Sequence, residues 1–164
     1  MPRVNYVKKA RQANSVAKVG EPYYWWKFRF GGKRFSKTPP KRSELTQSSF
    51  LSQLYDIQDR IADLTTEDIV GGCLDDIVSE IDSLRDEAQS SLDNMPEHLQ
   101  ETSSSGELLR ERIDGLELWG EELQSVNIPD ELTDEEEKDE EMVENYESEI
   151  EQALEEIQGA DCGL

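Results

Sequence analysis

The sequence contains little of what most enzyme sites and membrane spans require. Its 164 residues include two cysteines, Cys73 and Cys162, which lie far apart with no second Cys or His at metal-ligand spacing. No apolar run reaches the roughly 18 residues that a bilayer span needs. The first residues also lack the apolar segment of a secretory signal. We therefore expect a reduced, cytoplasmic chain that does not enter a membrane.

Large apolar side chains are scarce as well. Leu, Ile, Val and Phe make up 37 of the 164 residues, or about 23%. This fraction lies just above the range in which disorder is expected. The composition therefore argues against a large globular core and against an enzyme built around a deep apolar cleft. It favours an elongated helical protein, an interaction module or a partly disordered chain.

Motifs that carry catalysis or bind cofactors are missing too. His98 is the single histidine, and Met95 stands where a Glu-x-x-His metal motif would need a glutamate. The glycines at 31 and 32 precede Lys33 and Arg34 but do not satisfy the phosphate-binding pattern GxxxxGK[ST]. We therefore expect a non-enzymatic protein with no metal or other cofactor.

The net charge of -21 hides a sharp division of the chain. Residues 1–42 carry twelve Lys or Arg and one acid, a charge of +11, whereas residues 43–164 carry five basic residues and 37 acids, a charge of -32. Pro39 and Pro40 mark the boundary. The sequence therefore predicts a basic, aromatic-rich arm and β-hairpin over 1–42 and an acidic helical or coiled-coil region over 43–164. Such asymmetry favours a polyanionic partner for the basic end.

The aromatic residues of the basic region predict the hairpin. Residues 23–30 and 33–38 are rich in β-forming side chains and are joined by Gly31 and Gly32, which favours a two-residue turn. The cross-strand pairs are then Phe30–Lys33, Arg29–Arg34, Phe28–Phe35 and Trp26–Lys37. One face of this hairpin carries Tyr24, Trp26, Phe28, Phe30 and Phe35. The other carries Tyr23, Trp25, Lys27, Arg29 and Arg34.

The second of these faces is a candidate nucleic-acid interface. Directly opposed Arg29 and Arg34 repel each other unless an anion lies between them. Lysine and arginine can neutralise phosphates while aromatic rings stack on bases. The candidate binding residues are Tyr23, Trp25, Lys27, Arg29, Lys33, Arg34 and Lys37. Three partners remain open for this face: DNA or RNA, the acidic helices of the same chain, and an acidic surface of another protein.

The remaining parts of the basic region have simpler interpretations. The face that contains Trp26 is expected to be the core of the hairpin. Residues 4–19 show no clear periodicity and are predicted to be a basic arm that orders on binding.

Apolar spacing predicts four helices in the acidic region, over residues 43–64, 66–95, 107–127 and 133–159, with Ser43 and Thr66 as N-caps of the first two. The second has a heptad seam and is a candidate homodimer surface; the seam consists of Val70, Leu74, Ile77, Ile81, Leu84, Ala88 and Met95. Residues 101–106 are expected to be a polar linker, and residues 134–141 an acidic, solvated helix start. The predicted fold class is α+β, mostly α: a small basic β-hairpin followed by long acidic amphipathic helices in helical hairpins or a coiled coil.

Residues 23–40 read Tyr-Tyr-Trp-Trp-Lys-Phe-Arg-Phe-Gly-Gly-Lys-Arg-Phe-Ser-Lys-Thr-Pro-Pro. This stretch resembles a signature of small uncharacterised acidic proteins of tailed bacteriophages and mobile elements, and residues 43–48, 93–100 and 108–112 resemble the same group. The resemblance implies a phage product in a bacterial host and names no activity. The hairpin pattern is also similar to the arm-binding modules of tyrosine recombinases, in which a small sheet contacts DNA.

These observations support three hypotheses about function. The first is a non-enzymatic phage accessory protein in the host cytoplasm, whose hairpin binds nucleic acid and whose acidic helices self-associate or bind a host or phage protein. The second is an acidic DNA mimic that inhibits a host defence or DNA-binding protein. The third is a virion or assembly component. An intramolecular version is also open, in which the acidic helices cover the basic hairpin until a polyanion competes for it.

Overall fold

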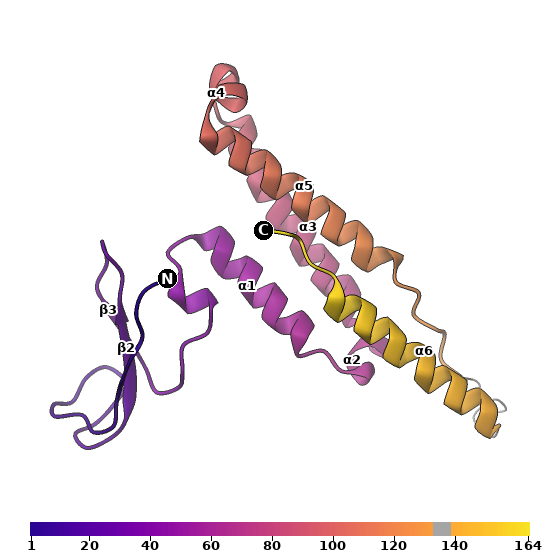
Figure 1. Ribbon diagram of the computed structural model, residues 1–164, viewed down its shortest axis with the longest axis horizontal. Helices are drawn as coiled ribbons and strands as arrows, with labels where there is room; N and C mark the ends of the chain where they lie inside the picture. Colours follow the sequence, from indigo (N-terminus) through magenta and orange to yellow (C-terminus); the bar gives the residue numbers. More distant parts are fainter. Residues whose placement is uncertain (133–138) are drawn as a thin grey trace. The chain divides into compact units, whose positions relative to one another are not determined.

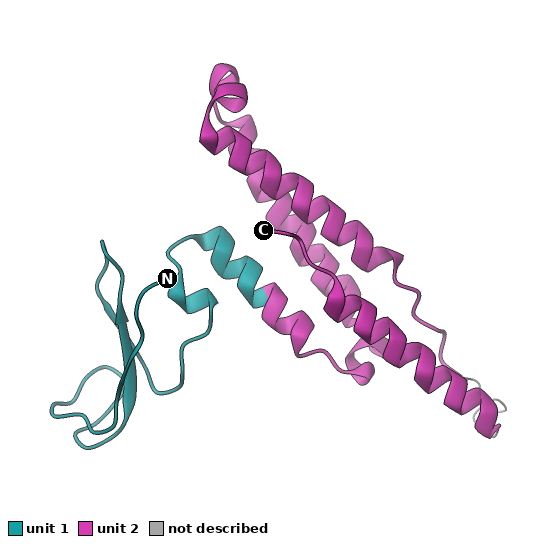
Figure 2. Cartoon of the chain, in the orientation of Figure 1, with its two compact units in different colours: residues 1–56 teal, residues 57–164 magenta. Residues whose placement is uncertain are grey.

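The computed structural model describes residues 1–132 and 139–164 and shows an α+β fold that is 58% helix and 8% strand (Figure 1). A small three-stranded antiparallel sheet at the N-terminus is followed by helices, which confirms the predicted fold class. The chain divides into two compact units, Met1–Asp56 and Ile57–Leu164 (Figure 2). The change in charge sign after residue 42 falls inside the first unit.

The sheet of the first unit contains β1 (Asn5–Val7), β2 (Tyr23–Lys27) and β3 (Lys33–Ser36) in that order. The β2–β3 hairpin was predicted, whereas β1 was not. A three-residue strand is too short to show alternation in the sequence, and β1 is fixed by pairing, with Tyr6 opposite Tyr24. The prediction that residues 4–19 order only on binding is therefore wrong for β1.

The register of the hairpin differs from the predicted one. Trp25 pairs with Phe35 and Lys27 pairs with Lys33, so residues 28–32 form the connection and the predicted two-residue turn is wrong. A two-residue hairpin turn needs positive φ, but neither Gly31 nor Gly32 adopts it. Instead, the Gly31 amide donates to the Phe28 carbonyl at 3.3 Å. The predicted pairs Phe30–Lys33, Arg29–Arg34, Phe28–Phe35 and Trp26–Lys37 are consequently all wrong.

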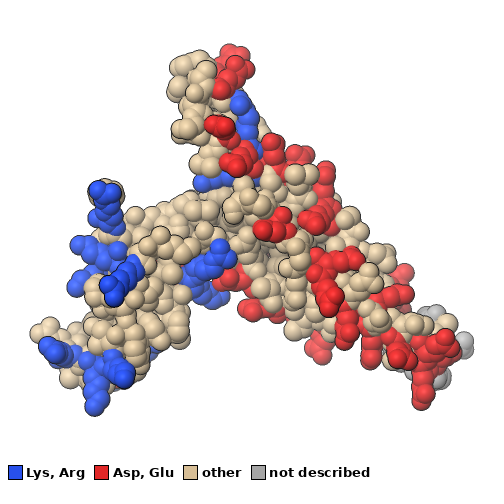
Figure 3. All heavy atoms as spheres, in the orientation of Figure 1, with Lys and Arg blue, Asp and Glu red and all other residues tan. Residues whose placement is uncertain are grey.

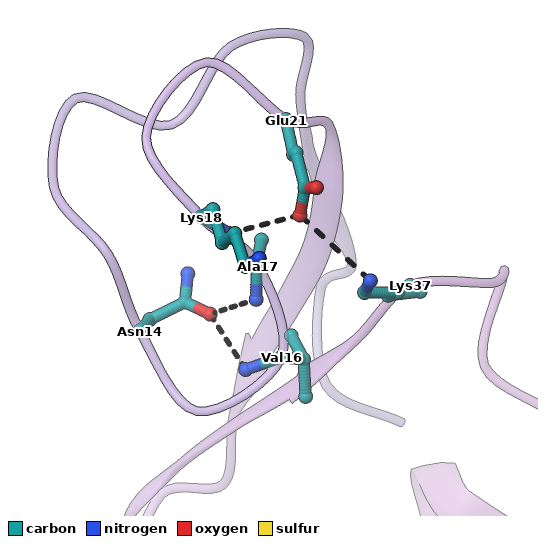
Figure 4. A network of polar contacts seen from close by, with 6 residues as sticks. All are labelled: Asn14, Val16, Ala17, Lys18, Glu21 and Lys37. Atoms are coloured by element: carbon teal, nitrogen blue, oxygen red, sulfur yellow. Dashed lines mark hydrogen bonds and ion pairs between the residues drawn. The ribbon is translucent and has the colours of Figure 1, made fainter.

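The long loop between β1 and β2 is fixed by polar contacts (Figure 4). Asn14 Oδ1 accepts hydrogen bonds from the amides of Val16 and Ala17, each at 2.9 Å. The Glu21 carboxylate accepts the Lys18 amide at 2.9 Å and pairs with the Lys37 ammonium at 3.7 Å. The single acid among residues 1–42 therefore joins this loop to the end of β3.

The core of the first unit is built around Trp26. Its side chain is 1% exposed, and its Nε1 donates to the Glu44 carbonyl at 3.2 Å. Glu44 belongs to η1 (Ser43–Leu45), a 3₁₀ turn that precedes α1 (Ser49–Ala62). The predicted helix over 43–64 is therefore two elements, and Ser48, whose Oγ accepts the Leu51 amide at 3.3 Å, lies just before the second. The expected role of Trp26 as a core residue is confirmed.

In the second unit the predicted second helix is divided into α2 (Thr66–Val70) and α3 (Cys73–Asp93). The division falls at Gly72, whose φ of 79° lies in the left-handed region that favours glycine. Thr65, not the predicted Thr66, is the N-cap of α2, and it forms a capping box with Asp68. The hydrogen bonds from Thr65 lower the pKa of the Asp68 carboxyl.

Helices α3 and α5 (Ser104–Ser125) pack side by side as an antiparallel hairpin, with α4 (Glu97–Thr102) at the turn (Figure 1). The heptad seam of α3 is buried within the chain from Leu74 to Ala88, so this surface is already covered without a second copy. The predicted polar linker over 101–106 is wrong. These residues end α4 and begin α5, whose N-cap Ser103 accepts the Gly106 amide at 3.0 Å.

The last helix, α6 (Glu140–Gly159), and the C-terminal residues complete the second unit. Gln158 Nε2 donates to the Leu64 carbonyl at 3.2 Å, and Gln58 Nε2 lies 3.7 Å from the Cys162 sulfur. Burial raises the pKa of the Cys162 thiol. The predicted start of this helix at residue 133, and most of its acidic run, lies outside the described residues. No helix within the described ranges is long and apolar enough to cross a membrane.

Replacing Gly106 with alanine is expected to destabilise the second unit. A Cβ at this position would lie 2.8 Å from the Leu99 carbonyl oxygen and would also clash with the carbonyl of Gln100. These carbonyl groups belong to the backbone and cannot move aside as the end of a flexible side chain can. We therefore expect the unfolding free energy to fall by roughly 1–3 kcal/mol. Urea denaturation would measure it. Gly159→Ala, which meets no atom within 4 Å, is the matched control, and equal stability of the two variants would contradict the packing.

Candidate nucleic-acid interface

One face of the β2–β3 hairpin combines aromatic rings with lysines. Side chains alternate along a strand, so β2 directs Tyr23, Trp25 and Lys27 to the face opposite Trp26. The observed pairing places Phe35 beside Trp25 and Lys33 beside Lys27 on the same face. We call these five residues, Tyr23, Trp25, Lys27, Lys33 and Phe35, the aromatic–lysine face.

The rings of this face form two groups. The Lys33 ammonium lies over the Trp25 ring, 4.8 Å from its centroid. The rings of Tyr23 and Phe35 lie 6.0 Å apart with a 50° tilt, a common aromatic arrangement. All three rings are partly exposed, and both lysines are exposed. The face thus offers ring surface to a ligand without unfolding the sheet.

Two like charges lie directly opposite each other on this face. Lys27 and Lys33 are cross-strand partners, an arrangement that destabilises a hairpin. Neither forms an ion pair with any residue that the structure describes. An anion bound between them would remove the repulsion. From the sequence, Arg29 and Arg34 were predicted to be the opposed pair with an anion between them. In the observed register, Lys27 and Lys33 are the opposed pair instead.

The other end of the face opens into a groove of about 520 Å³. The loop after β1 contributes Lys9, Arg11 and Asn14 to the groove, and the sheet contributes Tyr23 and Phe35. Basic side chains therefore lie at both ends of the aromatic surface. Sequence reasoning missed Lys9 and Arg11 because it assigned them to an arm without structure, and it missed Phe35 because the assumed register placed it on the buried face.

The other three predicted binding residues make contacts of their own. Arg34 is paired with Trp26 on the opposite face, and its guanidinium lies 5.7 Å from the centroid of the Phe28 ring. Arg29 is in the connection, with its guanidinium 5.2 Å from the Phe30 ring. Lys37 follows β3 and forms the ion pair with Glu21. The structure therefore brings together Tyr23, Trp25, Lys27 and Lys33 on one face and places Arg34 on the other. Arg29 borders the same hollow as Lys27. The β2–β3 register, continued by one position, sets Lys37 beside Tyr23.

The two units carry opposite charge. Residues 1–56 contain twelve basic residues and three acids, and residues 57–164 contain five basic residues and 35 acids. Figure 3 shows Lys and Arg gathered over the first unit and Asp and Glu over the helices of the second. The positive field of the first unit would attract a polyanion to the aromatic–lysine face.

Comparison with protein-family models, curated proteins and solved structures finds no match to this chain. Its function therefore has to be inferred from the chemistry of the surfaces described above.

Proposed function

We propose that this chain is a non-enzymatic phage accessory protein whose N-terminal unit binds nucleic acid through the aromatic–lysine face. The observation that carries the proposal is the presence, on one face of one sheet, of partly exposed rings and of two lysines that form no ion pair with a residue in the described ranges. Lysines at phosphates supply salt-dependent affinity, and bases stacked on rings supply about 1–3 kcal/mol each. Arg29, Arg34 and Lys37 add to the positive field around the site, with Arg34 on the opposite face of the sheet.

The acidic second unit has a different role in this proposal. Its 35 acids against five basic residues repel nucleic acid, so contact through the first unit is favoured. The same surface suits a basic host or phage protein, or self-association at raised salt, and we propose that it mediates such binding in the cytoplasm of the bacterial host.

Fluorescence anisotropy of labelled oligonucleotides with the full-length protein tests the proposal. We expect binding at about 50 mM salt that weakens steeply towards about 200 mM, because each neutralised phosphate releases counterions. No binding at low salt would contradict it. The acidic-mimic hypothesis would then be the next to test, by asking whether duplex DNA displaces the protein from a DNA-binding host protein.

The structure also defines the fragment with which to test masking by the acidic helices. A fragment ending at residue 42 would lack Glu44, whose carbonyl accepts the Trp26 indole hydrogen bond. The compact unit extends to Asp56. Tighter binding by residues 1–56 than by the full chain, with the fragment's fold checked by circular dichroism, is the result that masking predicts.

A further inference from the structure

We propose that the aromatic–lysine face selects single-stranded nucleic acid, with one base stacked on Trp25, another on the Tyr23–Phe35 pair, and an adjoining phosphate in the groove beside Lys9 and Arg11. This inference deepens the proposed function and rests on it. It specifies the class of ligand and the path that the ligand follows across the sheet.

The spacing of the rings favours separated bases. Trp25 and Tyr23 lie two positions apart on β2, and side chains two residues apart on a strand are separated by about 7 Å. Bases along one strand of a duplex rise by about 3.4 Å. Consecutive bases must therefore be pulled apart to stack on Trp25 and on Tyr23, which an unpaired strand allows and an intact duplex does not.

The chemistry of the face supports the same ligand. A duplex hides the flat surfaces of its bases and presents only their edges, which arginine, lysine and amide side chains read by hydrogen bonds. Of the two arginines in the hairpin segment, Arg34 lies on the opposite face, and the Arg29 guanidinium lies over the Phe30 ring in the connection. The face instead presents ring surface, which is suited to exposed bases.

The charges at the two ends of the face complete the path. Lys27 and Lys33 lie at one end, and Lys9 and Arg11 line the groove at the other. In the free protein the Lys33 ammonium lies over the Trp25 ring. An arriving base takes its place on the ring, and the ammonium moves to a neighbouring phosphate. No bond is made or broken in this exchange.

Tryptophan fluorescence of the full-length protein tests the stacking directly. Trp26 and Trp119 are each 1% exposed, so Trp25 is the tryptophan that a base can reach. We expect quenching by single-stranded DNA or RNA, and affinity for the preferred strand at least about tenfold above that for a duplex of the same sequence and salt. Trp25→Phe should retain binding and lose most of the quenching. Trp25→Ala should lose about tenfold or more in single-strand affinity while weak duplex binding persists.

The groove has its own matched pair of variants. Lys9→Ala with Arg11→Ala should weaken single-strand binding more than Lys8→Ala with Lys18→Ala, which removes the same charge from the same loop but from residues that do not line the groove. Equal losses of single-strand affinity in the two double variants would mean that the ligand does not enter the groove.

The outcomes separate this inference from the proposed function. Duplex binding as tight as single-strand binding, or quenching that persists in Trp25→Phe, would overturn the single-strand assignment and leave nucleic-acid binding intact. Absence of binding to single-stranded DNA, single-stranded RNA and duplex alike would overturn both.

Discussion

Replacing Trp26 with alanine is expected to unfold the N-terminal unit. Trp26 is among the largest fully buried side chains of the chain, and it also holds the sheet to η1 through its hydrogen bond to Glu44. Truncating a buried tryptophan costs roughly 3–5 kcal/mol. A unit of this size is marginally stable, so a loss of that magnitude removes most of its stability. Loss of the β-strand signals in an NMR spectrum, with the helical signals of the second unit retained, would be the expected result.

Trp25→Ala is the matched control for this prediction. It removes the neighbouring indole from the same strand, but Trp25 is partly exposed and lies on the other face. We expect it to cost less than half as much stability as Trp26→Ala. If the two variants were equally stable, Trp26 would not be the side chain that holds the sheet to η1.

Removing both lysines of the aromatic–lysine face is expected to have the second large effect. Lys27→Ala with Lys33→Ala should weaken binding of a single strand at low salt and reduce the slope of log affinity against log salt by about 1.4, which is about 0.7 for each lost phosphate contact. The same change relieves the repulsion between two opposed lysines and removes the contact of Lys33 with the Trp25 ring, so the stability of the hairpin should change little. Anisotropy over a salt series measures the slope.

Arg34→Ala with Arg42→Ala is the control for charge alone. It removes two positive charges from the same unit, but at residues whose guanidinium groups lie over the rings of Phe28 and Tyr55 rather than on the aromatic–lysine face. Long-range attraction should fall similarly in both double variants, whereas the slope should change mainly in the first. Equal changes in slope would mean that the charge of the unit, not the position of its lysines, determines binding.

The helical part of the fold was largely predictable because periodicity is a local property. The seam of α3 repeats every three or four residues, and its members from Leu74 to Ala88 are buried as expected. The helix ends were less accurate, because Gly72 and Ser103 act through backbone conformation and capping. Which helix covers the seam was not predictable, since α5 reaches α3 only through the turn at α4.

The register of the hairpin could not be predicted from periodicity. Its two strands were evident from composition, but the register depends on the φ angles of Gly31 and Gly32 and on where Phe28 is buried. Both are consequences of the packing of the whole unit. The observed pairing of β2 with β3 differs from the predicted pairing by three residues. As a result, Arg34 and Phe35 each lie on the face opposite to the predicted one.

The candidate site was predictable only where alternation along a single strand determines it. Tyr23, Trp25 and Lys27 were placed on one face by their spacing within β2, and that placement does not depend on register. Phe35 required the correct register, and Lys9 and Arg11 required the closure of the loop by Asn14 and Glu21. No periodic signal marks such a loop.

The most direct test of nucleic-acid binding by this face is NMR mapping of the full-length protein with a short unlabelled single-stranded oligonucleotide. We expect the backbone and side-chain shifts to change at β2, β3 and the loop around Lys9 and Arg11, with the Trp25 indole signal changing most and the Trp119 indole signal unchanged. Changes concentrated on the acidic helices of the second unit, or on Arg34 and its side of the sheet, would contradict it.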